Sequence, residues 1–116
     1  MIKLKRVYEK PSRDDGVRIL VERLWPRGLK KGEVAADLWL KEVAPSPELR
    51  QWFGHDPARW QEFRRRYLEE LRKNPKPVEL LKEKSQEGTI TLIFAAHDEA
   101  HNGAVVLQEF LEGHKG

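Results

Sequence analysis

Alternating and continuous runs of apolar residues predict four β-strands in this chain. The predicted strands cover residues 2–7, 18–24, 37–43 and 89–95. In the first, lysines alternate with Ile2 and Leu4, a pattern typical of a strand at the edge of a sheet. The second has a continuous apolar centre, which suits a strand covered on both faces. The fourth is the clearest, because it is β-branched as well as apolar. In the third, leucines alternate with Trp39 and Lys41, although the two alanines before it favour a helix instead.

Apolar residues at helical spacing, together with capping residues, predict four helices. The predicted helices cover residues 47–53, 57–73, 78–87 and 102–111, and residues 29–33 are expected to form a loop or one helical turn. Ser46 and Pro47 have the order of an N-cap and a first helical residue, and Gly54 can end that helix. An Asp-Pro pair at residues 56–57 repeats this signature before the longest helix, and an Asn-Pro-Lys-Pro segment is expected to break the chain after it. The tail from Glu112 is expected to fray.

Strands that alternate with helices predict a single α/β domain over residues 1–116. We expect a small, mainly parallel sheet of about four strands, with helices on both faces. Ligands of such sheets bind beyond the carboxyl ends of the strands. The segments that follow the predicted strands, residues 23–28, 41–46 and 97–102, would lie there. The fold class therefore directs the search for a site to these loops.

The composition bounds the function classes further. In 116 residues, 39% are hydrophobic and 35% are charged, which indicates one folded domain with a dense ionic surface. The 22 basic residues exceed the 19 acidic ones only slightly, which is closer to balance than is usual for a dedicated nucleic-acid-binding protein. The absence of cysteine excludes disulfides, thiol nucleophiles and thiolate metal sites. No signal peptide or long apolar run is present, so a soluble cytoplasmic protein is expected.

The loop after the second predicted strand combines two arginines with a rigid turn. Arg23 and Arg27 carry guanidinium groups that match carboxylate or phosphate in bidentate geometry. Trp25 offers a flat apolar wall. Pro26 restricts the backbone before Gly28, as a pre-organised site requires. The loop is therefore a candidate anion site. In the competing structural interpretation, the tryptophan belongs to the core, the proline merely ends the strand and the arginines pair with nearby acids.

Polar residues also follow the last predicted strand, where a helix begins. Free N–H groups and a partial positive charge at a helix N-terminus attract anions. Asp98 and Asn102 could orient a ligand there, or either could cap the helix. His97 could act as a general acid or base if Asp98 or Asp56 were its partner. A structural or solvent-facing histidine is the alternative.

These loops give the predicted ligand-binding set, which is Arg23, Trp25, Arg27, Gly28, Lys41, Asp98 and Asn102. No cofactor is expected. A metal site is not favoured, because the available ligands lack the spacing of a dedicated site; they are His55, Asp56, His97 and His101. Catalytic residues stay unassigned, since Ser46 is explained as a cap and no other nucleophile stands out.

Three consecutive arginines lie on the predicted long helix. Arg64 shares the apolar stripe, and an arginine on such a stripe needs a partner or a cleft for its charged end, so it could reach the pocket of Arg23 and Arg27. Arg65 and Arg66 are expected on a solvated face. The acids available to pair with them are Glu62 and Glu69.

The chain resembles the YeaO-like family of small bacterial proteins, a domain class of unknown function. The resemblance covers nearly the whole chain and is carried by residues 15–28, 39–41 with 44–46, 49–53 with 55–57, 60, 63, 66–67, 89–92, 95–98 and 102. The Trp-Pro-Arg-Gly segment at 25–28 is fairly specific. The resemblance implies a compact α/β domain and supplies no activity. It also implies a cation facing an anion at position 97, where the family usually has arginine or lysine, which disfavours catalysis by His97.

Three functions are therefore open from the sequence. The leading one is an anion-binding cleft for a phosphorylated or carboxylated small molecule, with enzyme activity undecided. The second is a nucleic-acid-binding module, with Trp25 or Trp52 stacking on bases beside a basic face. Its candidate basic residues are Lys3, Lys5, Arg6, Arg13, Lys30, Lys31 and Arg64 to Arg66. The third is a protein-interaction domain that uses residues 44–53. Oligomeric state is not predicted.

Overall fold

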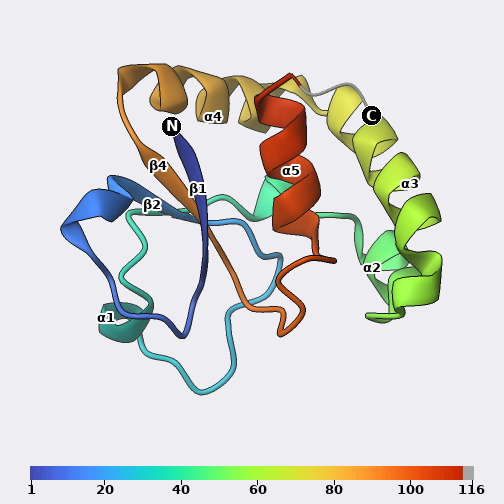
Figure 1. Cartoon of the computed structure of the whole chain (residues 1–116), viewed down its shortest axis with the longest axis horizontal. Helices are drawn as coiled ribbons and strands as arrows, with labels where there is room; N and C mark the ends of the chain where they lie inside the picture. Colours follow the sequence, from blue (N-terminus) through green and yellow to red (C-terminus); the bar gives the residue numbers. More distant parts are fainter. Residues whose placement is uncertain (114–116) are drawn as a thin grey trace.

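A parallel four-stranded sheet organises the computed structural model, which describes residues 1–113 (Figure 1). The order across the sheet is β1 (Ile2–Arg6), β4 (Ile90–Phe94), β2 (Val17–Leu20) and β3 (Leu38–Trp39). Every adjacent pair is parallel. β4 lies between β1 and β2, and its whole length is buried, in keeping with its apolar, β-branched sequence. The α/β class, the parallel sheet and the edge position of the first strand are confirmed.

Five α-helices lie in the described part of the chain: α1 (Lys31–Val34), α2 (Pro47–Phe53), α3 (Trp60–Arg72), α4 (Pro75–Glu87) and α5 (Gly103–Leu111). α2 has the predicted bounds, because the Ser46 side chain accepts the Leu49 N–H and Gly54 ends the helix in the left-handed conformation. α4 begins at Pro75 rather than at residue 78. Its prolines lie in the first turn, where the missing N–H groups cost no intrahelical hydrogen bond.

The long helix starts later than the sequence predicted. Asp56 accepts the N–H of Ala58 and caps a 3₁₀ turn, Pro57–Arg59, and α3 follows it. The predicted apolar stripe of α3 is confirmed, since its buried residues are Phe63, Tyr67 and Leu71. α5 ends at Leu111, and the part of the predicted frayed tail at residues 114–116 lies outside the described residues. Within residues 1–113, no helix has both the length and the apolar character needed to cross a membrane.

The second and third strands are shorter than predicted. Beyond the end of β2, the Val21 N–H still bonds to the Ile93 carbonyl at 3.1 Å. The next amide along β4, that of Ala95, donates instead to the side chain of Glu22, so backbone pairing ends there and not at residue 24. β3 has only two residues, and the predicted continuation to residue 43 is wrong because Lys41–Val43 forms a 3₁₀ turn.

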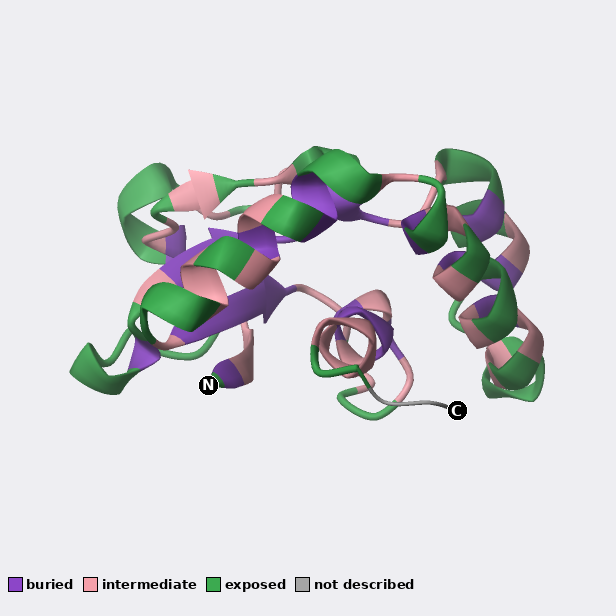
Figure 2. Ribbon diagram, turned by 90° about the horizontal axis from the view of Figure 1, so that it is seen from above, coloured by how far each residue is buried: buried purple, intermediate pink, exposed green. Residues whose placement is uncertain are grey.

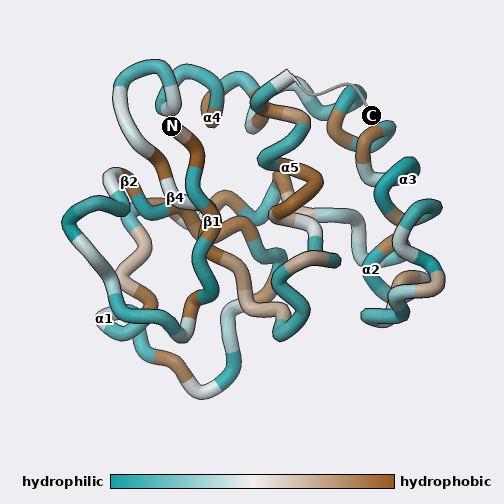
Figure 3. The backbone as a smooth tube through the Cα atoms, viewed as in Figure 1, coloured by the Kyte–Doolittle hydropathy of each residue, from teal (hydrophilic) through white to brown (hydrophobic). Residues whose placement is uncertain are grey.

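The two faces of the sheet are covered unequally. Ile19 and Leu92 belong to the larger core, which the sheet forms with α3, α4 and α5. Leu20 and Ile93, the next residues along the same strands, point to a smaller core that contains Val34 of α1. Buried residues therefore line the sheet and the inward sides of the helices (Figure 2), and the most hydrophobic segments gather in the same places (Figure 3). The prediction of helices on both faces is confirmed, with a single short helix on the second face.

The connection from β1 to β2 fixes the position of β2 in the sheet. It crosses β4 without an α-helix and is held by the buried Asp15, which pairs with Lys5 at 3.1 Å and with Arg18 at 2.6 Å. The hydroxyl of Thr91 on β4 donates to the Asp15 carbonyl. Gly16 then enters β2 with a φ of 62°. These contacts set the register that brings the carboxyl ends of β2 and β4 side by side.

Candidate ligand-binding site

Two adjoining cavities lie where the chain leaves β2 and β4. The path after β2 leads to β3 at one edge of the sheet, whereas the path after β4 leads to α5, which packs on β1 and β4. Loops that diverge at the carboxyl ends of neighbouring parallel strands leave a crevice between them. Here the crevice holds a larger cavity of about 490 Å³ and a smaller one of about 300 Å³. Both are lined by Glu22, Arg50 and Ala95, so these residues mark the junction.

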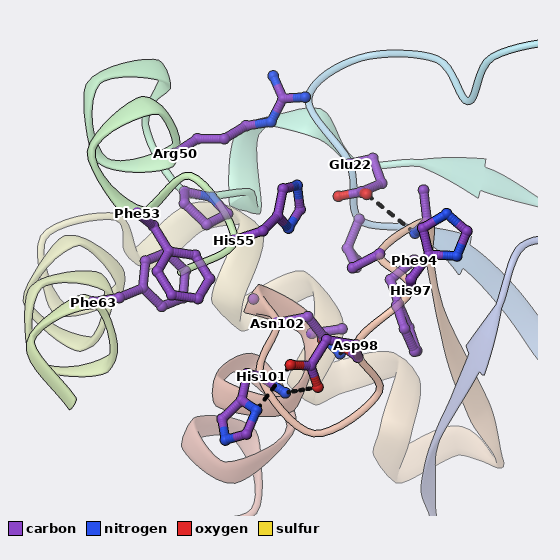
Figure 4. A pocket seen from close by; sticks show the side chains of 16 residues that line it. Glu22, Arg50, Phe53, His55, Phe63, Phe94, His97, Asp98, His101 and Asn102 are labelled. Carbon is purple, nitrogen blue, oxygen red and sulfur yellow. Dashed lines mark hydrogen bonds and ion pairs between the residues drawn. The ribbon is translucent and has the colours of Figure 1, made fainter. Parts of the chain in front are cut away.

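The larger cavity has an aromatic wall. Phe53 of α2 and Phe63 of α3 stack with ring centroids 4.3 Å apart, and Phe94 lines the cavity from the end of β4. All three are buried, because they also belong to the larger core. Figure 4 shows Phe53 and Phe63 on one side of the cavity and Glu22 on the other. An apolar wall faced by a few polar groups is typical of small-molecule sites.

The segment after β4 supplies the polar rim of the larger cavity. Asp98 accepts the N–H groups of Ala100 and His101 and pairs with the His101 ring at 2.9 Å. The hydrogen bond from His101, together with the two backbone N–H groups, lowers the pKa of Asp98. The Asn102 side chain accepts the N–H of Val105 as the N-cap of α5 and donates to the Asp98 carbonyl. Asp98 and Asn102 therefore lie together at the cavity, and Asn102 also has the capping role that the sequence allowed.

His97 also lines the larger cavity, with a partner that the sequence did not predict. Its Nδ1 lies 3.3 Å from a guanidinium nitrogen of Arg6. The suggested pairing with Asp98 or Asp56 is wrong, because Asp98 pairs with His101 and Asp56 caps the turn before α3. The physical reason is the turn at Asp98, which directs its carboxylate towards the start of α5.

Glu22 is the functional candidate that the sequence analysis missed. One carboxylate oxygen accepts the Ala95 N–H at 3.1 Å. The other accepts no hydrogen bond within residues 1–113, and Figure 4 shows it pointing towards His55. Burial raises the pKa of Glu22, although the Ala95 N–H and the charges of Arg50 and His55 oppose that shift. The available signal was an acidic residue directly after a continuous apolar run, at a predicted strand end.

The smaller cavity brings together three of the predicted residues. Arg23, Trp25 and Arg27 line it, and Arg50 reaches it from α2. The Arg23 guanidinium donates to the carbonyls of Ala44 and Pro45. Neither Arg23 nor Arg27 pairs with a carboxylate in the described structure, so the suggested pairing of these arginines with nearby acids is wrong. The Trp25 indole donates to the Leu29 carbonyl at 2.7 Å and is half-buried.

The remaining predicted residues lie outside both cavities. Gly28 has a φ of 75° and is exposed, whereas Lys41 places its ammonium 5.1 Å from the centre of the Trp39 ring. The prediction that Arg64 reaches the pocket is wrong, because it pairs with Glu109 of α5 at 2.6 Å. The expected pairs of Arg65 and Arg66 are confirmed; their partners are Glu62 and Glu69. Residues 1–113 contain no group of three acidic or histidine side chains placed to hold a metal.

Comparison with known proteins identifies relatives along the whole chain. The family model described as "Inactive DUF488-N3 subclade" matches residues 1–115. The uncharacterised protein YeaO of Escherichia coli (strain K12) is 41% identical over 110 residues, which cover 95% of this chain and 96% of that protein. The uncharacterised protein Rv3073c of Mycobacterium tuberculosis (strain ATCC 25618 / H37Rv) is 41% identical over 112 residues, covering 97% and 94%. No solved structure matches.

Proposed function

The chain belongs to the DUF488 family, in its inactive N3 subclade, and from this premise we propose that it binds a small anion, a phosphate or a carboxylate, in the smaller cavity. The resemblance to YeaO-like proteins is thereby confirmed. One observation carries the proposal: Arg23, Arg27 and Arg50 line one cavity in which Glu22 is the single lining acid among the described residues. Three cations against one carboxylate favour a negatively charged ligand.

The arginines differ in the part they would play. Arg23 uses its Nε and one Nη on backbone carbonyls, which fixes the guanidinium and leaves its other Nη for a ligand. Arg27 is exposed and has no ion pair in the described structure, so it can turn towards an anion. Trp25 forms a fixed wall beside them, because its ring packs edge-on against Trp39 at 5.3 Å. A fixed arginine next to an exposed one suits bidentate recognition of an oxyanion.

Binding without catalysis fits the family better than an enzyme. The matching subclade is described as inactive. The chain has no cysteine, and its histidine-aspartate pair, His101 with Asp98, is not accompanied by a serine or threonine among the residues lining the cavities. Asp98 and Asn102 then keep the role expected from the sequence, which is to orient the part of the ligand that extends into the larger cavity.

The alternative of a nucleic-acid-binding module has less support. The Trp52 ring, a candidate for stacking on bases, is already covered by the guanidiniums of Arg59 and Arg66 at 5.3 and 4.3 Å from its centre. Phe53, which the protein-interaction alternative needs at the surface, is buried in the larger core.

The test is titration with phosphate, sulfate and acetate, followed by tryptophan fluorescence and by NMR of the arginine side chains. We expect Arg27→Ala and Arg50→Ala each to weaken binding about ten-fold, because each removes a charge-assisted hydrogen bond. Arg65→Ala is the matched control, since it removes the same charge from the exposed face of α3. Equal binding by Arg27→Ala and Arg65→Ala would refute the assignment of the anion to this cavity.

A further inference from the structure

The two cavities adjoin at Glu22, Arg50 and Ala95 and offer different chemical environments. The larger cavity supplies an aromatic wall at Phe53, Phe63 and Phe94. The smaller cavity supplies arginines. Glu22 stands at the junction, because it lines both. A ligand that fills both spaces would therefore meet an apolar surface at one end, a carboxylate in the middle and cations at the other end.

The carboxylate in the middle is placed to accept a hydrogen bond from a ligand. One oxygen of Glu22 is engaged by the Ala95 N–H, which fixes the side chain. The second accepts no hydrogen bond in the described structure and points into the cavity, towards the side where His55 lies (Figure 4). Glu22 is partly buried, and a carboxylate that loses contact with water is costly unless its hydrogen-bonding capacity is used. The ligand group that would use it is a hydrogen-bond donor such as a hydroxyl, because an anion would be repelled there.

We propose that the ligand is a ribonucleoside monophosphate, with its base against the phenylalanines, a ribose hydroxyl on Glu22 and its phosphate among the arginines. This deepens the proposed function and rests on it, since the phosphate is the anion assigned above. Base, ribose and phosphate follow one another along a nucleotide in the same order as aromatic wall, carboxylate and arginines in the cleft. Phe53 and Phe63 stack on each other, so a base would pack against the parts of these rings that line the larger cavity. Carboxylates at strand ends of α/β sheets can hold ribose hydroxyls.

Other ligand classes match fewer of these environments. Free phosphate or a small dicarboxylate would occupy only the smaller cavity. It would leave the larger cavity, of about 490 Å³, and its aromatic wall without a ligand group. An aromatic carboxylate would cover the wall but would bring no hydroxyl to Glu22. Both cavities fall within the size range of small-molecule sites, roughly 300–1,000 Å³, so a ligand of nucleotide size is compatible with them.

Calorimetric titration with matched ligands tests the inference on the full chain. The panel contains AMP, GMP, CMP and UMP. The monophosphate that binds most tightly is then compared with its 2′-deoxy and 3′-deoxy forms, its nucleoside, ribose 5-phosphate and inorganic phosphate. We expect the best monophosphate to bind at least ten-fold more tightly than ribose 5-phosphate, because the base contacts the aromatic wall. One of the two deoxynucleotides should bind about five- to ten-fold more weakly than its ribonucleotide, because it leaves the Glu22 oxygen without a donor.

The variant Glu22→Gln separates the role of the carboxylate from that of the fold. Glutamine keeps an oxygen that can accept the Ala95 N–H, and thermal unfolding checks that the variant is folded. We expect it to lose the preference for the hydroxylated ribose while Arg65→Ala keeps that preference.

The outcomes distinguish this inference from the proposed function. If phosphate binds and Arg27→Ala weakens it, but no monophosphate binds more tightly than ribose 5-phosphate, the nucleotide assignment is overturned and the anion site stands. Indifference of both deoxynucleotides and of Glu22→Gln would overturn the role of Glu22. If neither phosphate nor any nucleotide binds, the anion site and the nucleotide assignment both fail.

Discussion

Replacing Gly16 with alanine tests the strand register on which the cleft depends. Gly16 joins the 3₁₀ turn Arg13–Asp15 to β2 with φ 62° and ψ −136°. A Cβ at this position would lie 2.0 Å from the carbonyl oxygen of Thr89. The same oxygen accepts the Val17 N–H at 3.0 Å, which is the first hydrogen bond between β2 and the β4 segment. The alanine therefore cannot be accommodated without moving β2 away from β4.

The expected cost has two parts. A residue with a Cβ loses about 1–3 kcal/mol in a backbone conformation that is essentially restricted to glycine. Separating the Val17 N–H from the Thr89 carbonyl loses a further hydrogen bond, worth about 1 kcal/mol. Together they predict a loss of about 3 kcal/mol of unfolding free energy for Gly16→Ala. At roughly 4 °C per kcal/mol for a chain of this size, the melting temperature should fall by about 12 °C.

Gly28→Ala is the matched control for this prediction. Gly28 also has a positive φ, 75°, but a Cβ there would meet no atom within 4 Å. Its cost is the left-handed conformation alone, about 1 kcal/mol. Both variants are measured by urea unfolding, followed by circular dichroism and tryptophan fluorescence. If the two lose the same stability within about 0.5 kcal/mol, the close approach of Gly16 to Thr89 does not exist in solution, and the placement of Glu22 that depends on it is wrong.

Three further substitutions test polar groups that are buried or partly buried. Burial raises the pKa of Glu22 above its ordinary 4.5, so ionisation of Glu22 lowers the stability of the folded protein as the pH rises above 4.5. Glu22→Gln should therefore have a higher melting temperature than wild type at pH 8 and the same melting temperature at pH 4. Tyr67→Phe should cost about 1–2 kcal/mol in urea unfolding, because the buried hydroxyl donates to the Val43 carbonyl at 2.6 Å. Asp15→Asn should cost about 3 kcal/mol, because it leaves the buried Arg18 without its carboxylate. Hydrogen bonds hold the pKa of Asp15 below its ordinary 3.8 in spite of burial, so wild-type and variant unfolding free energies should converge as the pH falls below 3.8.

Elements with local signals were predicted well. α2 was found with its bounds because its cap, its first proline and its terminal glycine are neighbours in sequence. β4 was predicted because five buried residues in a row give a strong apolar run. β2 and β3 were predicted too long, because their ends depend on partners elsewhere: the β4 amide that would extend the pairing of β2 bonds to Glu22 instead. An apolar run in the sequence cannot show which partner an amide will have.

The candidate site also divides into residues with a local sequence signal and residues that are placed by tertiary contacts. Arg23, Trp25 and Arg27 line one cavity beyond the end of β2. Arg50 was missed because it comes from α2, whose placement beside that loop is a tertiary contact with no local signal. The error at Arg64 has the same origin, since its partner Glu109 is 45 residues away in sequence.

Glu22 connects the fold to the proposed function. An apolar residue at position 22 would avoid the cost of removing a charge from water. The carboxylate instead ends the pairing with β4 by taking the Ala95 amide, which opens the crevice between the two strand ends. The raised pKa of Glu22 indicates that its charge is unfavourable at the position where the two cavities meet. A residue that costs stability where a cleft forms is expected at a functional site. On the proposal made here, a ribose hydroxyl offsets that cost, so Glu22→Gln should give a more stable protein that binds nucleotide less selectively. A variant that gains stability and keeps the ribose preference would leave the carboxylate without a functional reason.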